Sequence, residues 1–220
     1  MREAPPHPDR AFIQAHTRLR PVPLAPEIQL HLADESVEIW SRTEEALGEA
    51  GLPPPFWAFA WAGGQALCRY VLDQPSIVAR RAVLDFAAGS GLAGIAAAKA
   101  GASRVTASEL DPFAIAAVAL NAATNEVEIE TRRGDVCETD AGWDIVLAGD
   151  VFYEADPSRR IFDWLAQLSA RGATVLIGDP GRSYLPQHRL QAIAEYAVLV
   201  SRDLEDAESR RARVWRLVEA

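Results

Sequence analysis

A glycine-rich stretch that begins at Val83, VLDFAAGSGLAGIAAAKAGA, contains the residues best suited to hold a ligand. Gly89, Gly91 and Gly94 form a GxGxxG pattern, in which glycines let the backbone turn tightly and approach a bound group. The helix expected after them presents free N–H groups and positive potential at its start. The pattern suits an anionic or nucleoside ligand, but it also suits an ordinary turn from strand to helix.

Two acidic residues narrow the choice of ligand. Glu109 ends an expected strand 20 residues after Gly89, where a carboxylate can accept hydrogen bonds from ribose hydroxyls. Asp85 lies inside an apolar run, where a carboxylate is costly without a partner. It would repel a pyrophosphate but pair with the ammonium of an amino acid. A nucleoside joined to an amino acid, S-adenosylmethionine, satisfies both acids.

Further polar residues follow two later apolar runs. Asp135 could accept a hydrogen bond from an adenine amino group while Val136 packs on the ring, although a single aspartate here is more often a turn residue. Asp150 and Tyr153 follow the run DIVLAG, beyond the carboxyl edge of the expected sheet. Open α/β folds place their ligands at that edge, so we expect the reactive groups to meet there.

The elements that position these residues alternate from residue 81 onward. Short apolar runs and helical segments of about 10 to 15 residues follow one another, as in βα units on a parallel sheet. Strands are expected near 82–86, 104–109, 127–132, 144–148 and 173–178, and helices near 91–100, 112–124 and 156–170. One more helix is expected after GDPGRSYLP. The runs EYAVLVSRDLE and RRARVWRLVEA then leave no room for a helical crossover and should pair antiparallel.

These elements predict an α/β, Rossmann-like fold. We expect a mostly parallel seven-stranded sheet with five or six parallel strands, a terminal antiparallel hairpin and helices on both faces. Residues 55–220 would form this domain, and residues 1–54 a small N-terminal extension. In the extension, PEIQLHLADE alternates like a half-buried strand, and a helix is expected from about Ser36 to Ala50.

An aromatic group, FWAFAW, follows three consecutive prolines and precedes a short amphipathic helix, GGQALCRYVLD. Phe56 and Phe59 are expected to pack in the core. For Trp57 and Trp61 a core position and a place in the functional site are about equally supported by the sequence. Only the tertiary structure can show which of these aromatic residues lie in the core.

Composition limits the compartment and the partners. The chain of 220 residues is 49% apolar, yet no apolar run approaches the ~20 residues of a membrane span. Its net charge of −9 opposes binding to nucleic acid and suits a basic protein partner. Four histidines and two cysteines show no metal-ligand spacing, so no metal is expected. The first 30 residues contain no hydrophobic signal core, which favours a cytoplasmic protein.

Several motifs together resemble a known enzyme class. LDFAAGSG, SELDP, GDV and DIVLAGDVFYE are similar to the motifs of class I, seven-strand methyltransferases over about residues 55–220. FWAFAWAGGQAL, the DVFY element and GDPGRSYLP resemble the protein lysine methyltransferases, and most closely those of the electron transfer flavoprotein β-subunit. PVPLAPEIQLHLADE resembles the N-terminal region of that family. Ala88 stands where the family usually has another small residue, which changes little.

The resemblance implies a cofactor, S-adenosyl-L-methionine, and a place for it. Asp85, Gly89 and Gly91 would hold its methionine end, Glu109 its ribose, Asp135 and Val136 its adenine, with Trp61 and Gly63 in the element that closes over it. The implied substrate is a lysine of the electron transfer flavoprotein β-subunit beside its dehydrogenase recognition loop. A monomer is expected.

The same resemblance implies residues for the substrate. Asp150 would capture and orient the lysine amine, and Tyr153 would shape its channel or hydrogen-bond the amine. Because a carboxylate stabilises ammonium, we do not assign Asp150 as a strong base, and the proton would leave through water. Trp57 would contact the protein substrate, as would Asp179, Arg182 and Tyr184, whose loop leaves its strand at the same edge of the sheet; an ordinary proline-glycine turn also explains that loop.

Three alternative functions stay open at this point. A methyltransferase for another protein lysine or a small molecule would share every cofactor residue. An NAD-dependent oxidoreductase would share GxGxxG, but Asp85, the terminal antiparallel pair and the long segment before the glycines count against it. A noncatalytic binding protein could keep the fold, although Asp150 and Tyr153 favour an enzyme.

Overall fold

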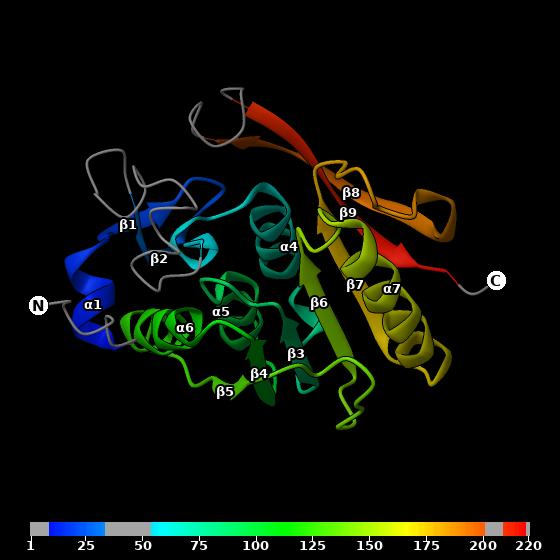
Figure 1. Cartoon of the computed structure of the whole chain (residues 1–220), viewed down its shortest axis with the longest axis horizontal. Helices are drawn as coiled ribbons and strands as arrows, with labels where there is room; N and C mark the ends of the chain where they lie inside the picture. The colour runs from blue at the N-terminus through cyan, green and yellow to red at the C-terminus, as the bar shows by residue number, and fades with distance from the viewer. Residues whose placement is uncertain (1–8, 34–53, 201–208, 219–220) are drawn as a thin grey trace, which may run out of the picture.

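The computed structural model describes residues 9–33, 54–200 and 209–218. Its centre is a seven-stranded sheet in the order β5-β4-β3-β6-β7-β9-β8 (Figure 1). The strands are β3 (Ala82–Phe86), β4 (Arg104–Glu109), β5 (Glu130–Arg133), β6 (Ile145–Gly149), β7 (Thr174–Asp179), β8 (Leu190–Leu199) and β9 (Ser209–Leu217). β3 to β7 pair in parallel, whereas β9 pairs antiparallel with both β7 and β8. The predicted parallel sheet with a terminal antiparallel hairpin is confirmed.

Helices cover both faces of the sheet, as the apolar runs of its strands require. They are α4 (Ala62–Asp73), α5 (Leu92–Lys99), α6 (Pro112–Thr124) and α7 (Ala155–Ala170). Along β6, Ile145 and Leu147 join the core beneath α4 and α5, while Val146 and Ala148 join the core beneath α7. Strands buried on both faces are apolar at every position, so β6 reads as a continuous apolar run.

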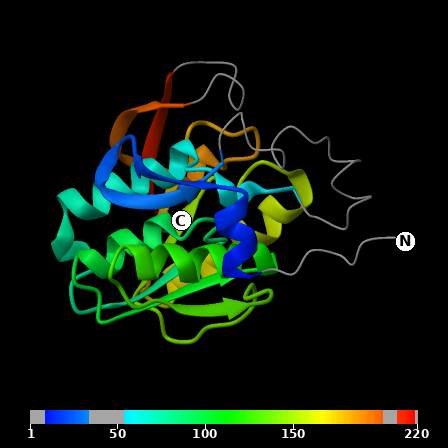
Figure 2. The ribbon, with the colours of Figure 1, turned by 90° about the vertical axis from the view of Figure 1, so that its left-hand side faces the viewer.

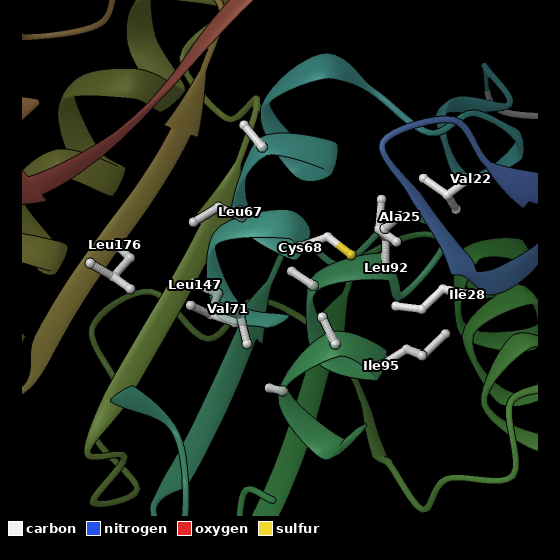
Figure 3. Packing of buried hydrophobic residues seen from close by; sticks show 14 of the residues in the cluster. Val22, Ala25, Ile28, Leu67, Cys68, Val71, Leu92, Ile95, Leu147 and Leu176 are labelled. Atoms are coloured by element: carbon white, nitrogen blue, oxygen red, sulfur yellow. The ribbon is translucent and has the colours of Figure 1, made fainter. Parts of the chain in front are cut away.

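The core between α4, α5 and the sheet includes the N-terminal hairpin (Figure 3). Side chains from β1–β2, α4, α5, β6 and β7 meet in one cluster, which includes Val22, Ile28, Leu67, Ile95 and Leu147. Each of these five side chains is fully buried. The hairpin thus contributes to the same core as the sheet.

The extension begins with α1 (Arg10–Ala15), β1 (Arg18–Val22) and β2 (Ala25–Leu32). β2 was predicted from its alternation, whereas β1 was not, because Pro21 interrupts its pattern and is tolerated only at an edge. The hairpin lies over the helices (Figure 2), and two asparagines, one in α6 and one at its C-cap, hold it there. Asn121 and Asn125 accept hydrogen bonds from the backbone N–H groups of His31 (2.8 Å) and Gln29 (3.1 Å). These side chains satisfy backbone donors that no neighbouring strand reaches.

Two expected helices have different outcomes. The helix predicted after GDPGRSYLP is wrong, since only a short 3₁₀ turn, Gln187–Arg189, precedes β8. LQAIAEYAVL contains good helix formers, but pairing with β9 along its length overrides that preference. The helix expected over 36–50 lies outside the described residues. Within the described ranges, no helix is long and apolar enough to cross a membrane.

Candidate active site

The residues singled out in the sequence gather at the carboxyl edge of the five parallel strands. The glycine loop follows β3, Glu109 ends β4, Asp135 follows β5, Asp150 follows β6 and Asp179 ends β7. Parallel strands bring these positions to one edge, although they are spread over almost a hundred residues of chain. The topology therefore assembles a single candidate site.

The glycine loop takes a left-handed backbone at three positions. Ala87, Gly89 and Gly91 have φ values of 51°, 52° and 81°. Gly91 is the N-cap of α5, and its N–H donates to the carbonyl of Ala88 at 2.7 Å. Left-handed turns let the chain reverse tightly from β3 into the helix without filling the space above it with side chains.

Asp85 lies beneath the first turn of α5. Its Oδ2 accepts a hydrogen bond from the N–H of Gly94 at 2.7 Å, and a Cβ atom at Gly94 would lie 2.9 Å from that oxygen. Gly94 is therefore a glycine because the carboxylate occupies the space of a side chain. Burial raises the pKa of Asp85 to about 8, against the Gly94 hydrogen bond, which lowers it. Its pairing with a ligand ammonium stays a prediction, and its partner within the chain is this backbone N–H.

Glu109 joins the ends of β3 and β4. Its Oε1 accepts from the N–H of Gly89 at 3.1 Å, and its Oε2 accepts from the N–H of Leu110 at 2.7 Å. Burial raises the pKa of Glu109, while these backbone donors lower it. Leu110 is 67% exposed, an apolar side chain beside a carboxylate at the ligand edge. We did not single it out from the sequence, where a lone leucine after an acidic residue gives no signal.

Asp135 and Val136 point in different directions. Asp135 is exposed and pairs with Arg160 of α7, which holds its pKa below the usual range. Its other oxygen accepts from the N–H of Cys137 at 2.9 Å. Val136 is buried in the core beneath α7. Val136 packs among core side chains there, and its contact with an adenine ring stays a prediction.

Asp150 is held in place by backbone and side-chain contacts. It has a left-handed backbone (φ 57°), its side chain is 8% exposed, and its N–H donates to the carbonyl of Gly178 at 2.9 Å. Oδ2 accepts from the N–H of Gly64 at 2.9 Å, and Oδ1 pairs with Nη2 of Arg182 at 2.9 Å. Burial raises the pKa of Asp150 to about 6, even though Arg182 lowers it.

α4 lies beside β6 (Figure 1), and glycines let it approach Asp150 closely. A Cβ atom at Gly63 would lie 2.1 Å from the carbonyl oxygen of Gly178 and 2.6 Å from Oδ2 of Asp150. A Cβ at Gly178 would likewise meet the carbonyl oxygen of Gly63. Gly63, predicted as a cofactor residue, thus has a packing role that brings the Gly64 N–H to the carboxylate. Gly178 is its counterpart, and we did not identify it from the sequence.

Three aromatic side chains form a rim beside Asp150, called here the aromatic rim: Phe56, Trp61 and Tyr153. The Phe56 ring lies 6.1 Å from the Trp61 ring and 5.9 Å from the Tyr153 ring, measured between centroids. Phe56 is 48% and Tyr153 51% exposed. The Trp61 indole N–H donates to the Phe56 carbonyl at 2.8 Å, which fixes its orientation. The rim offers aromatic faces to a cationic or apolar side chain.

Phe56 and Trp57 lie in different environments, and only Phe56 departs from its expected place. Trp57 is 2% exposed and packs against α6 and α1, which is the core position, and its contact with a substrate stays a prediction. Phe56, expected in the core, lies at the surface instead. Phe59 is buried as predicted. The 3₁₀ turn Phe56–Ala58 sends adjacent side chains in different directions, which an unbroken aromatic run does not reveal.

The loop after β7 holds three predicted substrate residues. Asp179 is buried, and its Oδ1 accepts from the N–H groups of Gly181 (2.6 Å) and Arg182 (2.7 Å). Asp179 thus shapes the loop that follows it, and its contact with a protein substrate stays a prediction. Arg182 turns inward to Asp150, and Tyr184 is exposed at the surface.

Sheet order and site together define the class of protein. An antiparallel strand inserted between β7 and β8, a left-handed glycine loop and a carboxylate ending β4 define a class I methyltransferase fold. A Synechocystis magnesium protoporphyrin IX methyltransferase with bound SAM has a similar structure, with a TM-score of 0.54, 12% identity, and coverage of 70% of this chain and 78% of that one. A Thermoplasma acidophilum protein matches with a TM-score of 0.55, at 19% identity, over 70% of this chain and 88% of that one. A family model described as "Ribosomal protein L11 methyltransferase (PrmA)" matches residues 64–177.

Relatives that match nearly the whole chain are more specific. The "Electron transfer flavoprotein beta subunit lysine methyltransferase" of Xenopus laevis is 38% identical, over 94% of this chain and 85% of that protein. The human protein of the same name is 36% identical, over 94% of this chain and 80% of that protein. The chain belongs to the family of electron transfer flavoprotein β-subunit lysine methyltransferases.

Proposed function

We propose that this protein methylates lysine side chains of the electron transfer flavoprotein β-subunit, with Asp150 and the aromatic rim as its lysine site. The observation that carries the assignment of this site is a buried carboxylate among exposed aromatic rings, at the same sheet edge as the glycine loop. A lysine offers a cationic end to the carboxylate and an apolar stem to the rings. The name carried by the full-length relatives supports the choice of substrate.

The cofactor of this reaction is S-adenosyl-L-methionine, which supplies an activated methyl group on a sulfonium. The glycine loop fits it, since its left-handed turns leave room above α5. Glu109 would hold the ribose hydroxyls, and exposed Leu110 would pack on the base. Asp85, which lies beneath the first turn of α5, would place its carboxyl group under the methionine end of the cofactor. Asp135 would reach an adenine amino group only while sharing its carboxylate with Arg160.

Lysine must lose a proton before it attacks, because its ordinary pKa is about 10.4 and only the neutral amine is nucleophilic. Desolvation among Phe56, Trp61 and Tyr153 would lower the lysine pKa, whereas the Asp150 carboxylate would raise it. At pH above about 6 Asp150 is mostly ionised, so it binds the arriving ammonium and orients it. Water at the exposed rim would take the proton. Tyr153 would line the channel that excludes bulk water during transfer.

The compartment and assembly are also proposals. Cys68 and Cys137 are both buried and free, in keeping with a reducing cytoplasm. Net charge −9 suits a substrate segment rich in lysine and disfavours nucleic acid. We propose a monomeric enzyme, because the parallel core is already covered on both faces by its own helices.

The test incubates the protein with labelled S-adenosylmethionine and the cognate electron transfer flavoprotein, then maps labelled residues by mass spectrometry. We expect label on β-subunit lysines, loss of that label with Asp150→Ala, and retention of cofactor binding. Asp163→Asn, an exposed acid on α7, is the matched control and should keep full activity. Cofactor binding without β-subunit labelling would redirect the search to other lysine proteins.

A further inference from the structure

Arg182 occupies the position at Asp150 that a substrate ammonium needs. Its Nη2 lies 2.9 Å from Oδ1 of Asp150, and its guanidinium carbon lies 5.6 Å from the centroid of the Trp61 ring. The guanidinium thus uses both recognition features of the proposed lysine site, a carboxylate and an aromatic face. The other carboxylate oxygen, Oδ2, is engaged by the backbone N–H of Gly64.

We infer that Arg182 is an internal occupant of the lysine site, which a substrate lysine must displace from Asp150 before methyl transfer. The inference rests on the proposed function, because it takes Asp150 as the lysine-binding group. It replaces the expectation that Arg182 simply contacts the protein substrate. Arg182 is then a positioning residue that controls access to the site.

The loop geometry indicates that the side chain, and not the backbone, moves. Asp179 accepts from the N–H groups of both Gly181 and Arg182, and the N–H of Tyr184 donates to the carbonyl of Phe152 at 3.3 Å. These hydrogen bonds fix the loop on both sides of Arg182. Rotation about its side-chain torsions can release the carboxylate while the loop stays in place.

Charge compensation explains why such an occupant is useful. A buried carboxylate without a partner costs several kcal/mol. Two charged side chains act on Asp150 here: Arg182 lowers its pKa, and Asp179 raises it. Exchange of Arg182 for a lysine ammonium keeps one cation at Asp150 throughout. The state in which Asp150 is free to bind a lysine is then a minor one. The apparent affinity for the substrate equals the intrinsic affinity multiplied by the fraction of molecules in that state.

The first experiment measures steady-state methylation of the flavoprotein by Arg182→Gln at about pH 8.5, well above the pKa of about 6 of Asp150. If Arg182 occupies Asp150 for about nine-tenths of the time, KM for the protein substrate falls about tenfold, and any change in kcat is smaller. Arg159→Gln, on the exposed face of α7, controls for loss of one positive charge and should leave both constants unchanged. A raised or unchanged KM in Arg182→Gln would overturn the inference.

A second experiment needs no methylation. The Arg182 Nε–H signal is identified in ¹⁵N NMR spectra by its loss in Arg182→Gln, and butylammonium chloride is added as a mimic of the lysine end. We expect the signal to move to the position it takes in Asp150→Asn, and not to move with sodium chloride at equal ionic strength. A signal insensitive to butylammonium would overturn the inference even if the flavoprotein is methylated. If butylammonium displaces Arg182 but the flavoprotein is not methylated, the inference about Arg182 stands and the proposed substrate is wrong.

Discussion

Adjacent glycines at the start of α4 should respond in opposite ways to the same substitution. In Gly63→Ala, the new Cβ would lie 2.1 Å from the carbonyl oxygen of Gly178, a backbone atom that cannot rotate away. In Gly64→Ala, the new Cβ has no heavy atom within 4 Å among the described neighbours. The two positions share a helix and differ only in what they face.

The magnitudes follow from overpacking and helix propensity. Overpacking typically costs 1–3 kcal/mol, and a backbone contact belongs at the upper end, so we expect Gly63→Ala to lose about 3 kcal/mol. Gly64→Ala should gain up to about 1 kcal/mol, because alanine loses less backbone entropy in a helix. For a chain of this size these values correspond to a Tm lower by roughly 6–12 °C and higher by roughly 1–4 °C.

Urea unfolding followed by circular dichroism measures both values, with equal m-values showing that the unfolded states are comparable. Gly63→Ala should also reduce methylation, because a shift of α4 moves the Gly64 N–H away from Asp150. Equal stability of the two variants would refute the reasoning. It would mean that α4 does not press against β7 at this point.

Three further outcomes are expected. Because the pKa of Asp85 is raised to about 8 in the folded protein, its contribution to stability is greatest below about pH 4 and is lost as pH rises towards 8. Asp85→Asn should therefore flatten the decline of the unfolding free energy with pH, measured by urea unfolding from pH 5 to 8. Glu109→Ala should weaken S-adenosylmethionine binding about tenfold or more by calorimetry, with Glu130→Ala on exposed β5 as control, and unchanged affinity would remove Glu109 from the ribose site. Trp57→Ala should lose about 3–5 kcal/mol of stability, whereas Phe56→Ala should lose little but raise KM; the reverse order would contradict their assigned places.

Local signals explain the elements that were predicted well. The helix expected over 112–124 begins at 112 because Asp111 accepts from the N–H of Phe113 at 2.8 Å and Pro112 suits the first helical position. The turn from β3 into α5 follows from glycines that tolerate a left-handed backbone. Such features depend on residues only a few positions apart, so the sequence displays them directly.

Contacts between distant segments explain the errors. The segment LQAIAEYAVL is a strand because β9 pairs with it, although alone it favours a helix. Val136 is buried beneath α7, whereas its apolar character alone suits a core position or a ligand contact equally. Trp57 and Phe56 differ in exposure because one 3₁₀ turn directs only Trp57 against α6, which lies more than fifty residues away.

The sequence by itself determined the α/β class, the parallel sheet with its terminal antiparallel hairpin, the glycine loop and the acids of the ligand edge. Apolar periodicity and backbone preference are local, and the carboxyl ends of parallel strands must share an edge. Only the tertiary structure decided which polar groups touch. The pairing of Asp150 with Arg182, 32 residues later, and the fit of Gly63 against Gly178 depend on how α4, β6 and β7 pack together, which no spacing along the chain encodes.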